Sequence, residues 1–316
     1  MSAADDSLDR ETGSAISLSK LRGSILARVS RSFYLSIRLL PKKLRDPVAL
    51  GYLLARASDT IADTTELPLD LRMENLRLLV RGIQGEALGD AIVGLSASVT
   101  PLQKNNAERA LIESLQSCLD WLGQSEVPDR EEVRAVLEQI NRGQVLDLER
   151  FRNPKQIAAL EKSAELDEYT YLVAGSAGEF WTRLCFRHLP KFSARSEGDM
   201  LGMGKRYGMG LQLINILREP ERFQPIYRKW REKAERGIEA GLEYANAIRN
   251  RRVRVATALP GLIGARTLAL LRNAGATALH RRIKVPRKEV RAIGASLVFG
   301  FGGRSQIDSL YRELSR

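Results

Sequence analysis

The stretch from Gly51 to Asp63 carries polar side chains at a spacing that an α-helix brings onto one face. Neither Gly nor Pro interrupts the chain from Tyr52 to Asp63. One turn of an α-helix takes about 3.6 residues, so residues three or four apart lie on the same side. Four polar residues follow these steps: Tyr52, Arg56, Asp59 and Asp63. The apolar residues between them lie on the other sides, so the stretch predicts a core helix with one polar stripe.

The two carboxylates of this stripe, Asp59 and Asp63, lie one turn apart and repel each other. Mg²⁺ is the natural cation to relieve that repulsion, because it takes hard oxygen ligands and often joins carboxylates to a phosphate. Arg56 on the same stripe can hold a phosphate through two hydrogen bonds. The same spacing is also common on solvated helix faces. The stripe alone therefore leaves two interpretations open, a magnesium–phosphate site and a solvated face.

The rest of the chain favours an all-α fold. Runs of alternating polar and apolar residues are scarce, and most of the 11 prolines stand near expected helix ends. Several helices carry a polar patch within an otherwise apolar face, which is typical of a helical bundle with a site at its centre. We expect residues 18–316 to form one large domain of this kind. Residues 1–17 are polar and acidic, and we expect them to be a frayed tail and not a signal peptide.

The charge of the chain points to an anionic partner. The formal net charge is +12, and the basic residues are concentrated only in Arg249–Arg254 and His280–Lys284. A basic chain can bind nucleic acid, an anionic lipid surface or a diphosphate substrate. Because no nucleic-acid-binding module is recognisable, nucleic acid is not an expected partner. Binding driven by charge alone would show steep salt dependence.

Cysteine content and hydropathy indicate a cytoplasmic protein. Cys118 and Cys185 form no metal or disulfide pattern, which suits a reducing compartment. The most apolar stretch, Ala256–Leu271, includes Pro260 and Arg266 and is too short to span a bilayer. We therefore expect it to be a core helix and expect no transmembrane segment.

Serines interrupt the first predicted helix, residues 18–39, within the sequence Ser30-Arg31-Ser32-Phe33-Tyr34. Serine hydroxyls compete for backbone hydrogen bonds and are poor helix-interior choices. Ser30 and Ser32 are therefore either bonded back to the helix or donors to a phosphate, and the sequence leaves both alternatives open.

Three further segments combine polar residues with glycine. Gln139, Gly143 and Asp147 are spaced by four residues, and Tyr171, Gly175 and Gly178 align on the next predicted face. Glycine on a helix face allows a close approach, either by a neighbouring helix or by an apolar ligand beneath the tyrosine. A third face carries Gln212, Asn215 and Glu219, and Pro220 ends that helix.

Taken together, these segments resemble the squalene/phytoene synthase family of head-to-head prenyltransferases. The resemblance runs from about Ser30 to about Leu271, and the order of all six motifs makes it specific. The motifs are Ser30-Arg31-Ser32-Phe33-Tyr34, Leu39-Leu40-Pro41, Tyr52-x3-Arg56-x2-Asp59-x3-Asp63, Arg142-Gly143-x3-Asp147, Tyr171-x-Val173-Ala174-Gly175-x2-Gly178 and Gln212-x2-Asn215-Ile216-Leu217-Arg218.

The resemblance implies an isoprenoid-synthase bundle that condenses two prenyl diphosphates through a cyclopropyl diphosphate. It implies that Asp59 and Asp63 bind Mg²⁺ and that Tyr52 and Arg56 bind diphosphate. By the same analogy, the donor site is lined by Ser30, Ser32 and Phe33, and Tyr171 lies near the reacting carbons. Arg56 joins Tyr171 as a candidate catalytic residue, and Gln212 and Asn215 are assigned to the second metal face.

One departure concerns the second acidic motif. The family continues its Asn-Ile-Leu-Arg sequence with two aspartates and a basic loop, whereas Glu219 and Pro220 follow Arg218 here. We therefore expect that a few dozen residues are absent between Arg218 and Glu219 and that the second metal site is incomplete. A chain of this form should bind prenyl diphosphate weakly and turn it over poorly.

The sequence leaves the exact reaction open. We expect farnesyl diphosphate as donor and a squalene-type product, with NADPH required if that product is squalene. One alternative is a phytoene synthase that uses geranylgeranyl diphosphate, and another is a relative that binds prenyl diphosphates without turnover. An apolar product also allows a peripheral contact with a membrane, into which the product would be released.

Overall fold

A computed structural model describes residues 16–30, 33–150, 163–217, 227–274, 283–300 and 302–316. These residues form helices joined by short connections, and within these ranges no β-strand occurs beyond an isolated bridge between Ser193 and Ile248. The expected all-α fold is therefore confirmed. Because the expected tail covers residues 1–17, most of it lies outside the described residues.

The N-terminal half of the chain contains one long helix and several short ones. Its elements are α1 (Leu18–Lys20), the π-helical turn η1 (Leu21–Ile25), α2 (Leu26–Ser30), α3 (Phe33–Leu39), α4 (Lys42–Asp63), α5 (Leu69–Gln84), α6 (Gly89–Val99), the 3₁₀ turn η2 (Thr100–Leu102), α7 (Asn106–Ile112) and α8 (Leu115–Gln124).

The C-terminal half contains the remaining long helices. Its elements are α9 (Val127–Arg150), α10 (Ser163–Thr170), the π-helical turn η3 (Tyr171–Gly175), α11 (Ser176–His188), α12 (Glu197–Leu217), α13 (Tyr227–Ala247), α14 (Arg251–Ala274), α15 (Arg287–Phe299) and α16 (Arg304–Leu314).

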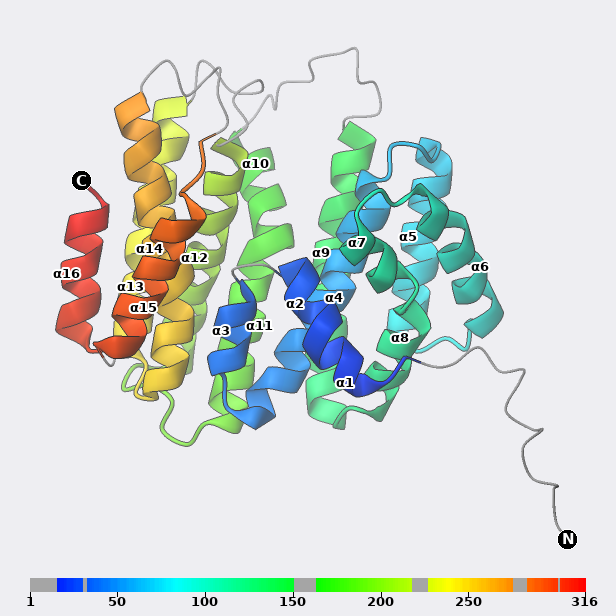
Figure 1. The fold of residues 1–316 in the computed structure, drawn as a ribbon, viewed down its shortest axis with the longest axis horizontal. Coiled ribbons are helices and arrows are strands. Elements are labelled where there is room, and N and C mark those ends of the chain that lie inside the picture. Colours follow the sequence, from blue (N-terminus) through cyan, green and yellow to red (C-terminus); the bar gives the residue numbers. More distant parts are fainter. Residues whose placement is uncertain (1–15, 31–32, 151–162, 218–226, 275–282, 301) are drawn as a thin grey trace, which may run out of the picture.

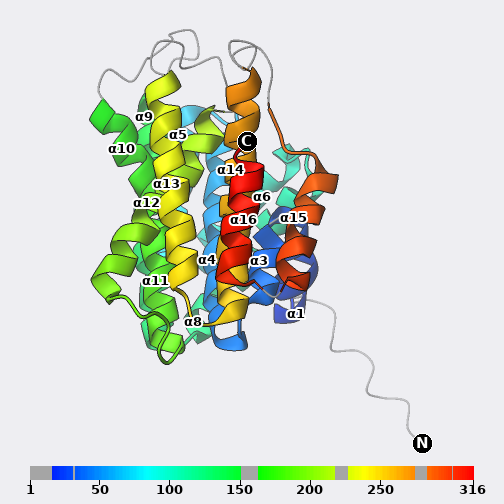
Figure 2. The same cartoon turned by 90° about the vertical axis from the view of Figure 1, so that its left-hand side faces the viewer.

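The long helices run side by side (Figure 1). The helices α5 to α8 form one flank, and α13, α15 and α16 form the opposite flank, which faces the viewer in Figure 2. Between the flanks, α4 packs on α9, and α12 packs on both α11 and α13. In Figure 1, α4, α9 and α12 end at the upper side, whereas α14 and α16 begin at the lower side.

The apolar sides of α4 and α14 fill the interior. Leu50, Leu53, Leu54 and Ile61 of α4 are almost completely inaccessible to solvent, as the periodicity of this helix predicts. A second core cluster surrounds α14, which is long and apolar enough to cross a membrane. Because 78% of its most apolar window is buried inside the protein, α14 is a core helix, as expected. Its length was underestimated, because the helix continues beyond the stretch Ala256–Leu271 at both ends.

Two helix boundaries differ from the predicted ones. The pair Asp46-Pro47 is typical of a helix start and by itself predicts one there, but α4 begins earlier, at Lys42, and Pro47 lies inside it. Pro47 is the sixth residue of α4, so the helix lacks the backbone hydrogen bond that residue 47 would otherwise donate to the Lys43 carbonyl. The single helix expected over residues 101–122 is divided into η2, α7 and α8.

Candidate functional site

The polar stripe of α4 forms one wall of the candidate site. Arg56 makes ion pairs with Asp59 on its own helix and with Glu108 on α7. Gln144 on α9 donates a hydrogen bond from Nε2 to Asp59 Oδ1 at 3.3 Å. The stripe therefore lies against two other helices. Asp63 at its end is exposed, so the stripe is covered by these helices only in part.

Other carboxylates surround Asp63 at the end of α4. Desolvation is the largest cause that raises the pKa of Asp63, to about 6, although its side chain remains open to solvent on one side. Repulsion by Asp59, Asp147 and Glu108 raises the pKa further, and only Arg56 opposes it. The pKa of Asp59 is also raised, chiefly by burial. The site thus concentrates negative charge that a single arginine does not balance.

Asp147 is the carboxylate that faces the α4 stripe from another long helix. It lies in the last turns of α9, at the same end of the bundle as Asp63 (Figure 1). Asp147 belongs to the motif Arg142-Gly143-x3-Asp147, but only Asp59 and Asp63 were predicted to be metal ligands. The spacing of Gln139, Gly143 and Asp147 was the signal in the sequence that could have identified it. The close packing of α9 on η3 explains the glycine at position 143, because a Cβ there would lie 2.6 Å from Val173 Cγ1.

Tyr169 on α10 completes this group. Burial raises the pKa of its hydroxyl above the ordinary value, and the charges of Asp147, Asp59 and Asp63 raise it further. The hydroxyl is hydrogen-bonded to Gln212 on α12. Tyr169 is therefore a neutral hydroxyl close to three carboxylates, and no sequence motif had singled it out.

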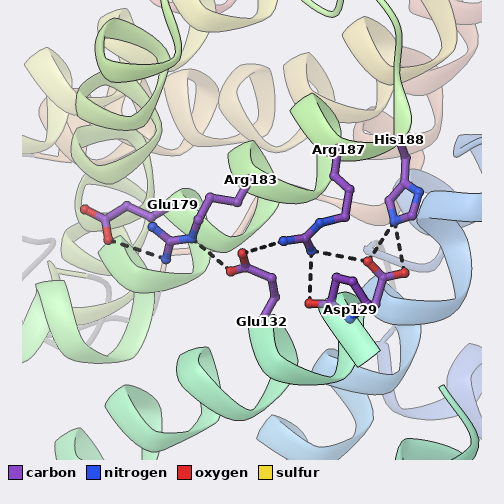
Figure 3. Close-up of polar contacts among 7 residues, drawn as sticks. Asp129, Glu132, Glu179, Arg183, Arg187 and His188 are labelled. Atoms are coloured by element: carbon purple, nitrogen blue, oxygen red, sulfur yellow. Dashed lines mark hydrogen bonds and ion pairs between the residues drawn. The ribbon is translucent and has the colours of Figure 1, made fainter. Parts of the chain in front are cut away.

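Tyr171, the predicted catalytic tyrosine, has different surroundings. Its hydroxyl donates to Glu179 Oε2 at 3.3 Å, and Lys205 Nζ lies 4.5 Å from the centre of its ring. Glu179 is one end of a row of ion pairs between α9 and α11, shown in Figure 3. The structure thus places Tyr171 beside this row and does not bring it together with the carboxylates of α4.

The row in Figure 3 joins the start of α9 to the end of α11. Arg183 and Arg187 donate to Glu132 at 2.9 and 3.0 Å, and His188 Nε2 lies 2.8 and 2.9 Å from the two carboxylate oxygens of Asp129. Two arginines and the histidine thus hold these helices against each other.

The π-helical turn η3 interrupts the regular helix at the segment that contains Tyr171. A π-turn adds a residue to a helical turn and rotates the residues before it relative to those after it. The alignment of Tyr171 with Gly175 and Gly178 assumed an uninterrupted α-helix, whereas η3 begins at Tyr171. Tyr169, on the other side of the turn, faces the acidic group instead.

A cavity of about 270 Å³ begins beside these polar groups. Gln212, which bonds Tyr169, lines it together with Asn215, and Asn215 donates to Gln212 Oε1 at 3.4 Å. Most of the remaining wall is apolar or small, and it includes Phe33, Val173, Ala177, Trp181, Leu211 and Ala256. The predicted residues Phe33, Gln212 and Asn215 are thus brought together around one cavity.

Close contacts between helix backbones shape this cavity. A Cβ at Gly208 on α12 would lie 2.1 Å from the Ala174 carbonyl oxygen, and one at Gly178 would lie 2.0 Å from the Gly204 carbonyl oxygen. Gly178 thus serves the approach of a neighbouring helix, the first of its two predicted roles. It also lines the cavity.

The other predicted donor-site residues lie on the first helices. Ser30 is buried and its hydroxyl donates to the Leu26 carbonyl at 2.5 Å, which corresponds to the back-bonded alternative. Tyr52 donates to the Val29 carbonyl at 3.2 Å, and its ring centre lies 5.3 Å from that of Phe33. Ser32 lies outside the described residues.

The donor set suits a magnesium ion. Asp59, Asp63 and Asp147 offer hard oxygen atoms, and their mutual repulsion is the condition that a divalent cation relieves. The described side chains do not, however, converge into a group of three or more metal-ligating residues. The segment expected to hold the second acidic motif, around Glu219 and Pro220, lies outside the described residues.

Comparison with known sequences identifies the protein class. The model of the squalene/phytoene synthase family matches residues 26–222, which is more than half of the chain. A squalene synthase of Botryococcus braunii is 27% identical over 199 residues, covering 62% of this chain and 38% of the relative. A squalene synthase of Nicotiana benthamiana is 26% identical over 198 residues, covering 62% and 42%. The matched part thus spans about two fifths of these relatives.

Relatives with other products also match. Lycopaoctaene synthase of Botryococcus braunii is 24% identical over 286 residues, covering 79% of this chain and 60% of the relative. A bifunctional lycopene cyclase/phytoene synthase of Colletotrichum graminicola is 27% identical over 198 residues, covering 61% and 31%. These identities do not distinguish one product from another.

Solved structures share the fold. The complex of TcSQS with the ligand BPH1237 has a TM-score of 0.69 and 19% sequence identity, covering 93% of this chain and 89% of that chain. A dehydrosqualene synthase in complex with a ligand has a TM-score of 0.55 and 19% identity, covering 93% and 95%. At this identity the similarity concerns the fold alone.

Proposed function

Since this chain belongs to the squalene/phytoene synthase family, we propose that it is a Mg²⁺-dependent prenyltransferase that joins two prenyl diphosphates head to head. The supporting observation is the position of Asp59, Asp63 and Asp147 beside Gln212, where the apolar cavity begins. A diphosphate binds at a cationic or metal-loaded end, and a prenyl chain needs an apolar wall. The two halves of such a substrate therefore match adjoining parts of the site.

In this proposal, each of the described polar residues binds either the metal ion or the diphosphate. Asp59, Asp63 and Asp147 would hold Mg²⁺, which when bound neutralises charge on the diphosphate leaving group. Arg56 would exchange one of its two carboxylate partners, Asp59 or Glu108, for a phosphate oxygen. Tyr169 keeps its proton because its pKa is raised, so it would donate a hydrogen bond at the edge of the cavity.

The cavity would protect the reacting carbons. Ionisation of an allylic diphosphate produces a carbocation, which water would capture unless the site excludes it. The walls from α11, α12 and α14 are mostly apolar and closely packed. Phe33 at this wall would contact the donor chain, and Asn215 beside Gln212 would bind on the diphosphate side.

We propose farnesyl diphosphate as the donor and a squalene-type product, with a cyclopropyl diphosphate as intermediate. Mass spectrometry of the products from farnesyl and geranylgeranyl diphosphate, each with and without NADPH, tests this choice. Exclusive use of geranylgeranyl diphosphate would contradict it in favour of a phytoene-type reaction. Binding of both donors without product would favour the non-catalytic alternative.

The metal assignment has its own test. Asp59→Asn and Asp63→Asn should each abolish most Mg²⁺-dependent release of diphosphate while the fold is retained, because neither carboxylate belongs to the apolar core. The matched control is Asp46→Asn, which changes a half-buried carboxylate near the start of the same helix that pairs with Arg22. Wild-type release of diphosphate by either site variant would refute the assignment.

A further inference from the structure

The basic run Arg249–Arg254 has no role in the proposed reaction. It begins α14 at the lower side of the bundle in Figure 1, whereas α4 and α9 carry their carboxylates to the upper side. The start of α16 and the end of α15 lie at the same lower side in both views (Figures 1 and 2). A diphosphate held by Asp63 and Asp147 is therefore at the other end of the molecule.

The side chain of Arg254 connects these helix ends, which together form one corner of the molecule. Its buried guanidinium donates to the Ile248 carbonyl at 2.7 and 2.9 Å and to the Gly302 carbonyl at 3.1 Å. Gly302 has a positive φ of 58°, and a Cβ there would lie 2.3 Å from Val255. The turn between α15 and α16 is thus fixed against the first turn of α14.

This corner gathers like charges at the surface. The pKa of Arg254 is lowered, first by burial and then by the charges of Arg304 and Arg251, which therefore lie near it. Arg249, Arg251, Arg252 and Arg304 are exposed. Among the described residues, Arg249, Arg252 and Arg304 form no ion pair, and the acidic neighbours Glu243 and Asp308 contact Arg195 and Asn246 instead.

The same corner exposes large apolar side chains at the end of α15. Phe299 is 81% exposed, more than any other large apolar residue in the described part of the chain, and Val298 is 51% exposed. Leu297 beside them is fully buried and holds the helix to the core. We call Val298, Phe299, Arg249, Arg251, Arg252 and Arg304 the basic corner.

We propose that the basic corner docks the protein on an anionic lipid surface. Basic side chains near such a surface each contribute about 1 kcal/mol of attraction, and an exposed aromatic ring can enter the boundary between headgroups and acyl chains. A purely polyanionic partner would use the arginines but leave Phe299 in water. The combination of both kinds of side chain therefore favours lipid over nucleic acid.

The position of the corner suits release of an apolar product. Ala256 and Thr257 directly follow the basic run on α14 and line the cavity. The cavity thus extends from the carboxylate end of the bundle toward the docked end, where a hydrocarbon product would enter the lipid. Docking itself is independent of the proposed function, because it can be measured without substrate.

The experiment is flotation of the purified full chain with phosphatidylcholine vesicles that either contain or lack phosphatidylglycerol. We expect flotation with the anionic vesicles at low salt and much less with the neutral ones. Phe299→Ser should lower the vesicle partition coefficient about tenfold, since a buried aromatic side chain contributes roughly 1.5–3 kcal/mol. The double variant Arg251→Glu/Arg252→Glu should lower it at least about 25-fold, because each of the two lost attractions is worth about fivefold.

Each variant has a matched control on the opposite flank. Val93→Ser on α6 changes a valine that is 59% exposed, and Arg77→Glu/Arg81→Glu on α5 makes the same change in net charge. Both controls should float like the wild type. Thermal unfolding of every variant verifies that the fold is retained.

Three results would overturn the proposal. Equal flotation with neutral and anionic vesicles would exclude recognition of the anionic headgroup. An equal loss in the α5 control would mean that net charge alone drives binding. Wild-type flotation by Phe299→Ser, together with loss in the arginine variant, would indicate a site for polyanions such as nucleic acid and not for lipid.

Discussion

At the scale of single residues, the main question is which tyrosine serves the site. Tyr169 is bonded to Gln212 near three carboxylates, whereas Tyr171 is bonded to Glu179 beside the ion pairs of Figure 3. We expect Tyr169→Phe to lower kcat at least about tenfold, because a hydrogen bond among charged groups contributes roughly 1.5–3 kcal/mol. Tyr171→Phe is the matched control and should stay within about threefold of the wild type.

Steady-state assays of diphosphate release with both variants decide between the two tyrosines. A large loss of kcat in Tyr171→Phe with little change in Tyr169→Phe would restore the assignment suggested by the family motif. It would also mean that η3 changes its helical register when substrate binds.

The raised pKa of Asp63 predicts how stability and magnesium binding depend on pH. Its pKa of about 6 in the folded chain exceeds the ordinary value of 3.8, so the folded state holds this proton more tightly than the unfolded state. The stability contributed by this group is therefore present below about pH 4 and lost as the pH rises through about 6. Because the carboxyl is open to solvent on one side, the effect on stability should be small.

Magnesium binding should show the opposite trend. The cation competes with the proton, so its affinity should fall severalfold between about pH 7.5 and about pH 5. Titration calorimetry of the free chain with Mg²⁺ measures this, and Asp63→Asn should bind more weakly and with less dependence on pH. Equal wild-type affinities at both pH values would contradict a role for Asp63 as ligand.

At the scale of helices, the packing of α12 against η3 decides the shape of the cavity. Gly208→Ala would place a methyl group 2.1 Å from the Ala174 carbonyl oxygen, and neither backbone can yield without moving its helix. We expect this substitution to lower the free energy of unfolding by roughly 1–3 kcal/mol or more.

Gly202→Ala on the same helix is the control. The nearest atom to its added Cβ is Arg206 Nη1 at 3.6 Å, an ordinary contact with the end of a flexible side chain. Alanine in place of glycine should therefore stabilise α12 by up to about 1 kcal/mol. Urea unfolding monitored by circular dichroism measures both variants, and a neutral Gly208→Ala would show that α12 and η3 are not closely packed.

At the scale of the whole molecule, the balance of charge at the site limits turnover. Asp59 and Asp63 share one face of α4 and Asp147 acts on Asp63 electrostatically, while the sequence at Arg218 and Glu219 lacks the second aspartate pair of the family. Loss of one electrostatic partner commonly costs about two to three orders of magnitude in rate. We therefore expect slow turnover by the 316-residue chain.

An insertion tests this expectation. A variant that carries the acidic segment of the family between Arg218 and Glu219 should condense farnesyl diphosphate about two to three orders of magnitude faster than this chain. An insertion of equal length with the aspartates changed to asparagine is the control. Equal rates for the chain as written and the acidic insertion would mean that Asp59, Asp63 and Asp147 suffice.

The sequence by itself determined the class of fold and one wall of the site. The stripe on α4 depends only on the pitch of a helix, so Arg56, Asp59 and Asp63 could be placed together without knowledge of any neighbour. The apolar composition of Ala256–Leu271 likewise predicted a core helix, and α14 is buried along that stretch.

Only the tertiary structure decided which stripes face one another. Asp147, Gln144 and Glu108 reach the α4 stripe from other helices, and no local spacing encodes the packing that brings them there. The π-turn at η3 rotates Tyr169 toward the carboxylates, because it breaks the regular period on which sequence alignment of a helix face relies. The buried Arg254 likewise fixes a corner from three chain segments, and this corner gives the basic run its place beside Phe299.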